Sequence, residues 1–134
     1  MNKSEIYQMF FNCLAKMKFN IYNCGVNFVD EVLELSSLID EGTALLYRIA
    51  ASEGIVLKYD MTSIESQADY PYVEGCRLNI DNFKDEMNKV VDHLLSHIKE
   101  VSSIFREDGK FYVSNLLEDY GTKLYRFKIG GLYE

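Results

Sequence analysis

Two histidines stand at a spacing that would let both side chains reach one metal ion. His93 and His97 are four residues apart in a segment with helical periodicity, and Glu100 follows one turn later. Imidazole nitrogens and carboxylate oxygens ligate zinc and other transition metals, so these three residues are candidate metal ligands. The residues between the histidines are Leu, Leu and Ser, so the Glu that serves as general base in the zinc-protease motif is missing. Both histidines also fall at the border of the apolar stripe, where half-buried imidazoles are the alternative interpretation, and we predict no bound metal or cofactor.

The three cysteines offer no catalytic arrangement. Cys13, Cys24 and Cys76 are an odd number without tight spacing, which argues against a disulfide scaffold. Cys13 falls on an apolar helical stripe, where a thiol packs as a small hydrophobe. A nucleophilic thiol needs a neighbouring base, and nothing in the sequence places one beside Cys24. Glycine-rich phosphate-binding motifs are also missing, so we predict no catalytic residue and a protein that is not an enzyme.

Composition describes an ordinary globular domain. The chain has 134 residues, of which 48% are apolar and 26% charged, with a formal net charge of −7. This length favours a single compact domain over residues 1–134, and the apolar fraction excludes a disordered chain. The negative field repels phosphate backbones, so nucleic acid is not the expected partner. No apolar run of about 18 residues and no secretory signal is evident; we therefore expect no membrane span and a cytoplasmic location.

The acidic residues concentrate in the middle of the sequence. Residues 25–54 carry a net charge of −5, against +2 for residues 1–24. A field of this kind steers association with a basic partner. The chain also has ten tyrosines, a residue type enriched in interfaces, and Tyr70 and Tyr72 flank the single proline as candidate anchors. The candidate acidic contacts are Asp30, Glu31, Glu34, Asp40 and Glu41.

These features predict a non-enzymatic cytoplasmic interaction protein. The expected form is an acidic inhibitor or immunity-type protein that binds a basic site on another protein, such as a toxin or nuclease. The alternative is a small-molecule or metal-binding regulatory domain, with its ligand between the long third helix and a sheet. Homodimerisation through a helix face is compatible with both.

The elements that would position these residues begin with a helix. Ser4 is a good N-cap, and apolar residues then recur at three- and four-residue steps to about Phe19. Two asparagines and a glycine within residues 20–25 indicate a connection.

A second apolar stripe runs from Asn27, a candidate N-cap, to Gly54, which is placed to end a helix. Gly42 interrupts this stripe. The segment is therefore either one helix of about 25 residues or two helices, the second capped by Thr43.

The third helix has the clearest periodicity and is expected to run from Asp81 to Asp108-Gly109. Four segments rich in β-forming residues are expected to be strands: residues 55–60, 76–80, 110–114 and 123–129. One helical turn is expected between the last two, over residues 114–121. The predicted fold is α+β, with two N-terminal helices and then a small, mostly antiparallel four-stranded sheet that has one long helix between its hairpins.

Overall fold

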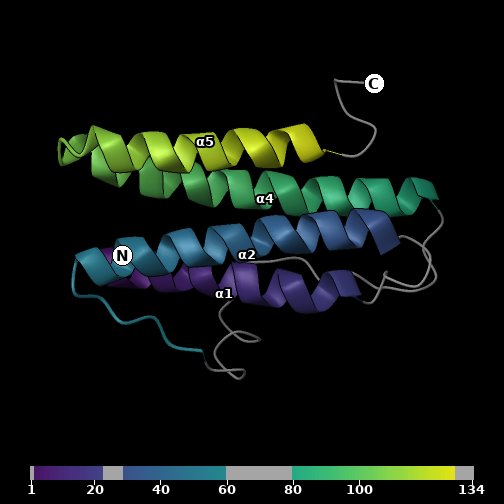
Figure 1. Cartoon of the computed structure of the whole chain (residues 1–134), viewed down its shortest axis with the longest axis horizontal. Coiled ribbons are helices and arrows are strands. Elements are labelled where there is room, and N and C mark those ends of the chain that lie inside the picture. Colours follow the sequence, from purple (N-terminus) through teal and green to yellow (C-terminus); the bar gives the residue numbers. More distant parts are fainter. Residues whose placement is uncertain (1, 23–28, 60–79, 129–134) are drawn as a thin grey trace.

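Four helices pack side by side in a computed structural model that describes residues 2–22, 29–59 and 80–128. They are α1 (Lys3–Tyr22), α2 (Val29–Ser52), α4 (Ile80–Glu107) and α5 (Phe111–Phe127). Figure 1 shows the pair α4 and α5 stacked on the pair α1 and α2; α2 and α4 run in the same direction, and α1 and α5 run in the opposite one. Helix α1 contacts α2 and α4, and α5 contacts α4 and α2. The four helices therefore form a closed ring in cross-section, with the apolar core along its axis.

The predicted α+β fold is wrong, because the described residues contain helices and no strand. Residues 55–59 follow α2 without strand structure. The expected strand over 76–80 lies outside the described residues except for Ile80, which begins α4. The two strands expected over 110–114 and 123–129 fall in α5 as far as Phe127.

Helix α5 was missed because its composition and its periodicity disagree. It holds Phe, Tyr, Val and Thr, which are enriched in strands. However, the residues that it buries against the other helices recur at three- and four-residue steps, which is helical spacing: Leu117, Tyr120, Leu124 and Phe127. Packing of this stripe outweighs the local preference, which is a weak one.

Helix α2 is continuous through Gly42, so the one-helix alternative is correct. Tyr120 of α5 lies against Gly42, and a Cβ atom there would meet the Tyr120 hydroxyl oxygen at 2.3 Å. The hydroxyl donates a hydrogen bond of 2.7 Å to the Leu38 carbonyl oxygen. Burial raises the pKa of the Tyr120 phenol, which keeps the donor protonated. Thr43 does not cap a second helix, because its hydroxyl donates to the Ile39 carbonyl oxygen one turn earlier, at 3.0 Å.

The helix ends agree with the sequence in part. Asn2 caps α1 in place of Ser4: its side-chain oxygen accepts the Glu5 N–H at 2.9 Å, and its amide donates to the Glu5 carboxylate at 3.0 Å. The bond from the Glu5 N–H is an N-cap, and the second bond joins the two side chains. Gly54 and Gly109 end α2 and α4 with φ of 70° and 76°. At the first, the Ile55 N–H donates to the Ala50 carbonyl oxygen at 2.8 Å, as in a Schellman motif.

The core draws on all four helices. Its largest fully buried side chains come from α1, α2 and α4: Tyr7, Phe10, Phe11, Leu14, Met17, Leu35, Ile39, Leu46 and Phe105. Within the described ranges, no helix has the length and apolar character needed to cross a bilayer.

Candidate functional site

An apolar groove of about 360 Å³ opens between α1 and α2. Phe11 lies at its floor, and the rings of Tyr47 and Tyr59 meet it edge-on, with centroids 5.4 and 5.9 Å away. Tyr47 and Tyr59 remain 42% and 59% exposed. The groove is therefore lined by aromatic surface that a partner's side chain can reach, and we call it the aromatic groove. Its other lining residues are Leu14, Ala15, Lys18, Ile39, Asp40 and Thr43.

Tyr59 is held at the groove by two hydrogen bonds between the Gln8 side chain and the backbone of Lys58, the residue before it. The Gln8 amide nitrogen donates to the Lys58 carbonyl oxygen at 2.9 Å, and the Lys58 N–H donates to the Gln8 amide oxygen at 3.0 Å. Leu57 is buried in the core. These contacts fix the segment after α2 against α1, so Tyr59 presents a positioned ring.

The outer side of α2 continues from the groove toward the start of the helix. At 100° per residue, Val29, Leu33, Asp40 and Tyr47 fall within about 40° of one another around the helix axis. Val29 and Leu33 are 52% and 58% exposed. We call this stripe, with the adjacent Asp30 and Glu34, the α2 face.

The predicted acidic contacts divide into two groups. Asp30 and Glu34 are exposed and Glu31 is half-buried, and among the described residues none of the three forms an ion pair. Asp30 and Glu31 also lie in the first turn of α2, where their charge favours the positive end of the helix dipole. Within this first group, Asp30 and Glu34 supply negative charge next to Val29 and Leu33 that no described residue pairs.

The second group takes part in contacts between helices. Asp40 pairs with Lys18 of α1 at 2.5 Å, at the edge of the aromatic groove. Glu41 pairs with Lys123 of α5 at 2.6 Å. Part of their charge is therefore compensated within the bundle, and their contribution to a long-range field is smaller than the sequence suggests.

The predicted tyrosine anchors Tyr70 and Tyr72 lie outside the described residues. Of the exposed aromatic residues that the structure does place, Tyr47 and Tyr59 line the aromatic groove, and the sequence reasoning did not select them as anchors. Tyr47 carries a signal that could have been used: it follows Leu46, a core residue of α2, so helical periodicity turns it toward solvent. No pattern in the sequence brings Tyr59 to α1.

The structure brings together a different set of candidate metal ligands from the set that the sequence predicts. His93 and His97 lie one turn apart on α4, with ring centroids 5.2 Å apart. Glu100 is exposed and is not part of their group. The third member is Cys13 of α1, and one ligand atom from each of the three residues lies within 4.8 Å of the other two. Sequence reasoning missed Cys13 because the contact joins two helices that are distant in the chain.

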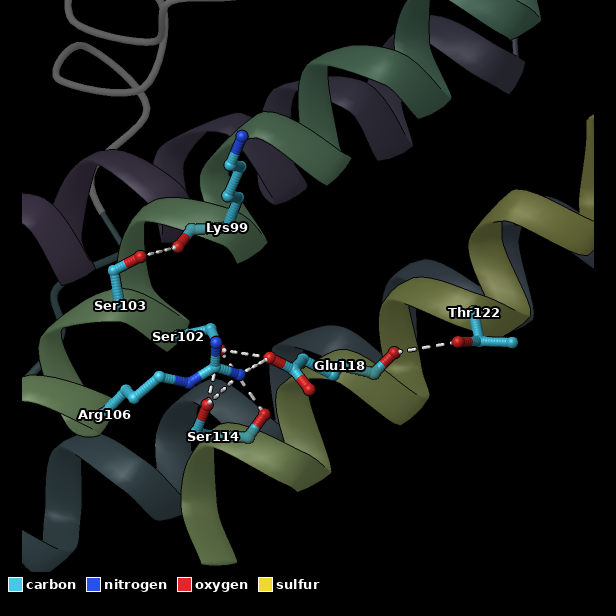
Figure 2. Close-up of polar contacts among 7 residues, drawn as sticks. All are labelled: Lys99, Ser102, Ser103, Arg106, Ser114, Glu118 and Thr122. Atoms are coloured by element: carbon cyan, nitrogen blue, oxygen red, sulfur yellow. Dashed lines mark hydrogen bonds and ion pairs between the residues drawn. The ribbon is translucent and has the colours of Figure 1, made fainter. Parts of the chain in front are cut away.

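A second groove, of about 430 Å³, lies between α4 and α5, and several of its lining residues form polar contacts between the two helices (Figure 2). The buried hydroxyls of Ser102 and Ser114 are 2.7 Å apart. The Arg106 guanidinium donates to the Glu118 carboxylate and to the Ser114 hydroxyl. Because these groups satisfy one another, the network joins α4 to α5 and is better explained as a structural contact than as a ligand site.

Comparison with known proteins gives one informative match. No family model matches the chain, and no solved structure matches it. The chain is similar to the Sca1 complex protein phr of Dictyostelium discoideum, with 31% identity over 113 residues. The match covers 78% of this chain and 11% of the relative's length. The chain therefore resembles one segment of a much longer protein.

Proposed function

We propose that the chain is a helical interaction module that binds a basic, amphipathic helical segment of another protein along the α2 face. The observation that carries the proposal is the pairing of Val29 and Leu33, each more than half exposed, with the carboxylates of Asp30 and Glu34. Apolar anchors surrounded by charge are the usual composition of a helix-binding surface. Acidic side chains select a partner whose own anchors are flanked by Lys or Arg.

The dimensions of the face fit such a segment. From Val29 to Tyr47 the helical rise of 1.5 Å per residue gives a length of about 27 Å, which a partner helix of about 18 residues spans. Leu33 and the aromatic groove then offer two apolar contacts near opposite ends of the face. Buried apolar area at these contacts supplies affinity, and the carboxylates mainly raise the association rate and exclude acidic partners.

The comparison supports an interaction role. The matched relative is by name a protein of the Sca1 complex, and assembly into a complex requires contact surfaces. Our proposal concerns the segment alone, because the match covers 11% of that relative. A cytoplasmic location and a role as an inhibitor of a toxin or nuclease stay predictions.

The test uses a synthetic probe of the stated chemistry. A fluorescent amphipathic peptide with leucines on one face and lysines on the other is titrated with the chain, and anisotropy is recorded. The triple variant Asp30→Lys, Glu31→Lys, Glu34→Lys is the perturbation. An exposed ion pair contributes about 0.2–1 kcal/mol. Since each reversal turns an attraction into a repulsion, we expect the dissociation constant to rise about tenfold or more.

A matched control carries the same change of net charge on another helix. Asp85, Glu100 and Glu107 are exposed residues of α4, and the triple Lys variant at these positions should bind within about threefold of the parent. A second peptide with glutamates in place of the lysines should not bind. Equal loss in both triple variants would mean that only the net charge matters, and no loss in either, or no binding of the lysine peptide, would refute the α2 face as the site.

A further inference from the structure

A cluster of three metal-ligating side chains lies in the core, apart from the α2 face. Cys13 on α1 is fully buried, and His97 on α4 is buried beside it. The Cys13 Sγ atom lies 3.2 Å from the His97 Nε2 atom. His93, one turn before His97, is half-buried, and its Nε2 atom is enclosed. One sulfur and two imidazole nitrogens therefore converge on a single point between two helices.

The surroundings hold these donors in place. The ring of Phe10 stacks on His97, with centroids 5.5 Å apart and planes inclined by 7°. The two imidazoles meet edge-to-face at 77°, so they approach the cluster from different directions. Buried apolar residues occupy the neighbouring turns of both helices: Met17, Val90, Leu94 and Val101. An apolar, packed shell of this kind strengthens metal–ligand electrostatics and limits exchange of the ligands.

We propose that Cys13, His93 and His97 bind a zinc ion that links α1 to α4. In a tetrahedral zinc site with Zn–S of about 2.3 Å and Zn–N of about 2.0–2.1 Å, the ligand atoms lie about 3.3–3.6 Å apart. The three ligand atoms lie within 4.8 Å of one another without an ion. Side-chain rotations that move each ligand atom by a fraction of a bond length would reach that geometry. One tetrahedral position remains for water or another small donor.

The donor set restricts the metal. A thiolate with two imidazoles suits zinc or copper, whereas magnesium and calcium require oxygen ligands. Binding converts the Cys13 thiol to a thiolate, and its proton leaves to solvent. The bound thiolate neutralises one of the two charges of the ion, which lowers the cost of placing the ion in the core. The ion would cross-link α1 and α4 through ligands as far apart in the sequence as Cys13 and His97, 84 positions, and so stabilise the folded state by mass action.

The decisive measurement uses Co²⁺ as a spectroscopic probe for zinc. The chain carrying Cys24→Ser and Cys76→Ser retains Cys13 as its single thiol. One equivalent of Co²⁺ should produce a thiolate-to-cobalt charge-transfer band and the intense visible bands of tetrahedral cobalt. Zinc should displace the cobalt at one ion per chain, and it should raise the melting temperature, whereas Mg²⁺ should do neither.

Two further variants identify the ligands. His93→Gln changes a half-buried residue and preserves the Cys13–His97 contact, so the variant should fold while its zinc affinity falls at least about tenfold. Glu100→Gln is the control, since Glu100 is exposed and outside the cluster, and it should bind as the parent does. Absence of the charge-transfer band, unchanged affinity in His93→Gln, or uptake of Cu⁺ through these residues with no uptake of zinc would overturn the assignment.

Discussion

Gly42 and Gly121 are both buried glycines in the middle of a helix, and the structure predicts opposite effects when each is replaced by alanine. At Gly42, the added Cβ atom would lie 2.3 Å from the Tyr120 hydroxyl oxygen and 2.6 Å from its Cζ atom. These distances are more than about 1 Å inside ordinary contact. At Gly121, the nearest atoms are side-chain carbons of Leu95 and Ile98 at 3.5 Å, which is ordinary contact.

The magnitudes decide the sign in each case. Alanine gains about 1 kcal/mol over glycine in a helix interior. At Gly42 that gain is opposed by overpacking of about 1–3 kcal/mol and by loss of the Tyr120 hydrogen bond to Leu38, about 1 kcal/mol. We therefore expect Gly42→Ala to lower the free energy of unfolding by about 1–3 kcal/mol. Gly121→Ala should raise it, by up to about 1 kcal/mol.

Urea unfolding monitored by circular dichroism measures both values, provided that the slope of the free energy against urea is unchanged. The parent and the two variants should fall in the order Gly121→Ala, parent, Gly42→Ala from most to least stable. If Gly42→Ala were as stable as the parent, the close approach of Tyr120 to α2 would be refuted, and with it our explanation of why α2 continues through a glycine.

Other substitutions test separate features by the same urea assay. Gly54→Ala and Gly109→Ala should each cost about 1–2 kcal/mol, because both positions have positive φ. Ser102→Ala should cost about 1 kcal/mol, because it removes the closer of two partners of the buried Ser114 hydroxyl; equal stability would show that the remaining contacts or water replace it. Tyr120→Phe should cost about 1 kcal/mol through the lost hydrogen bond to Leu38.

The helices that could be predicted are those whose periodicity, caps and terminators agree. The third helix was expected to span Asp81 to Asp108-Gly109 and is α4, Ile80–Glu107, because a continuous stripe and a terminal glycine point to the same ends. Helix α2 was recognised with its length left open, since Gly42 resembles a break until its contact with Tyr120 is known. The region of helix α5 was assigned to two strands around a single helical turn, because its β-forming residues outweighed its four-residue spacing.

For the candidate sites too, the sequence predicts contacts within one helix but not contacts between helices. Helical spacing correctly put His93 and His97 on one side of α4. Glu100 was chosen as the third ligand because sequence reasoning can see only residues on the same helix. Cys13 reaches the histidines through the packing of α1 on α4, which no spacing encodes. Likewise, the charges of Asp40 and Glu41 were visible, but their ion pairs with Lys residues of other helices were not.

The most direct test of the interaction face is a map of where the basic peptide binds. Backbone amide chemical shifts of the isotopically labelled chain are recorded during titration with the lysine–leucine peptide. We predict that the largest shifts lie along α2, at Asp30, Leu33 and Tyr47, and that they diminish as salt is added. Shifts confined to the groove between α4 and α5, or to the exposed Phe111 and Tyr112 at the start of α5, would contradict the proposed function.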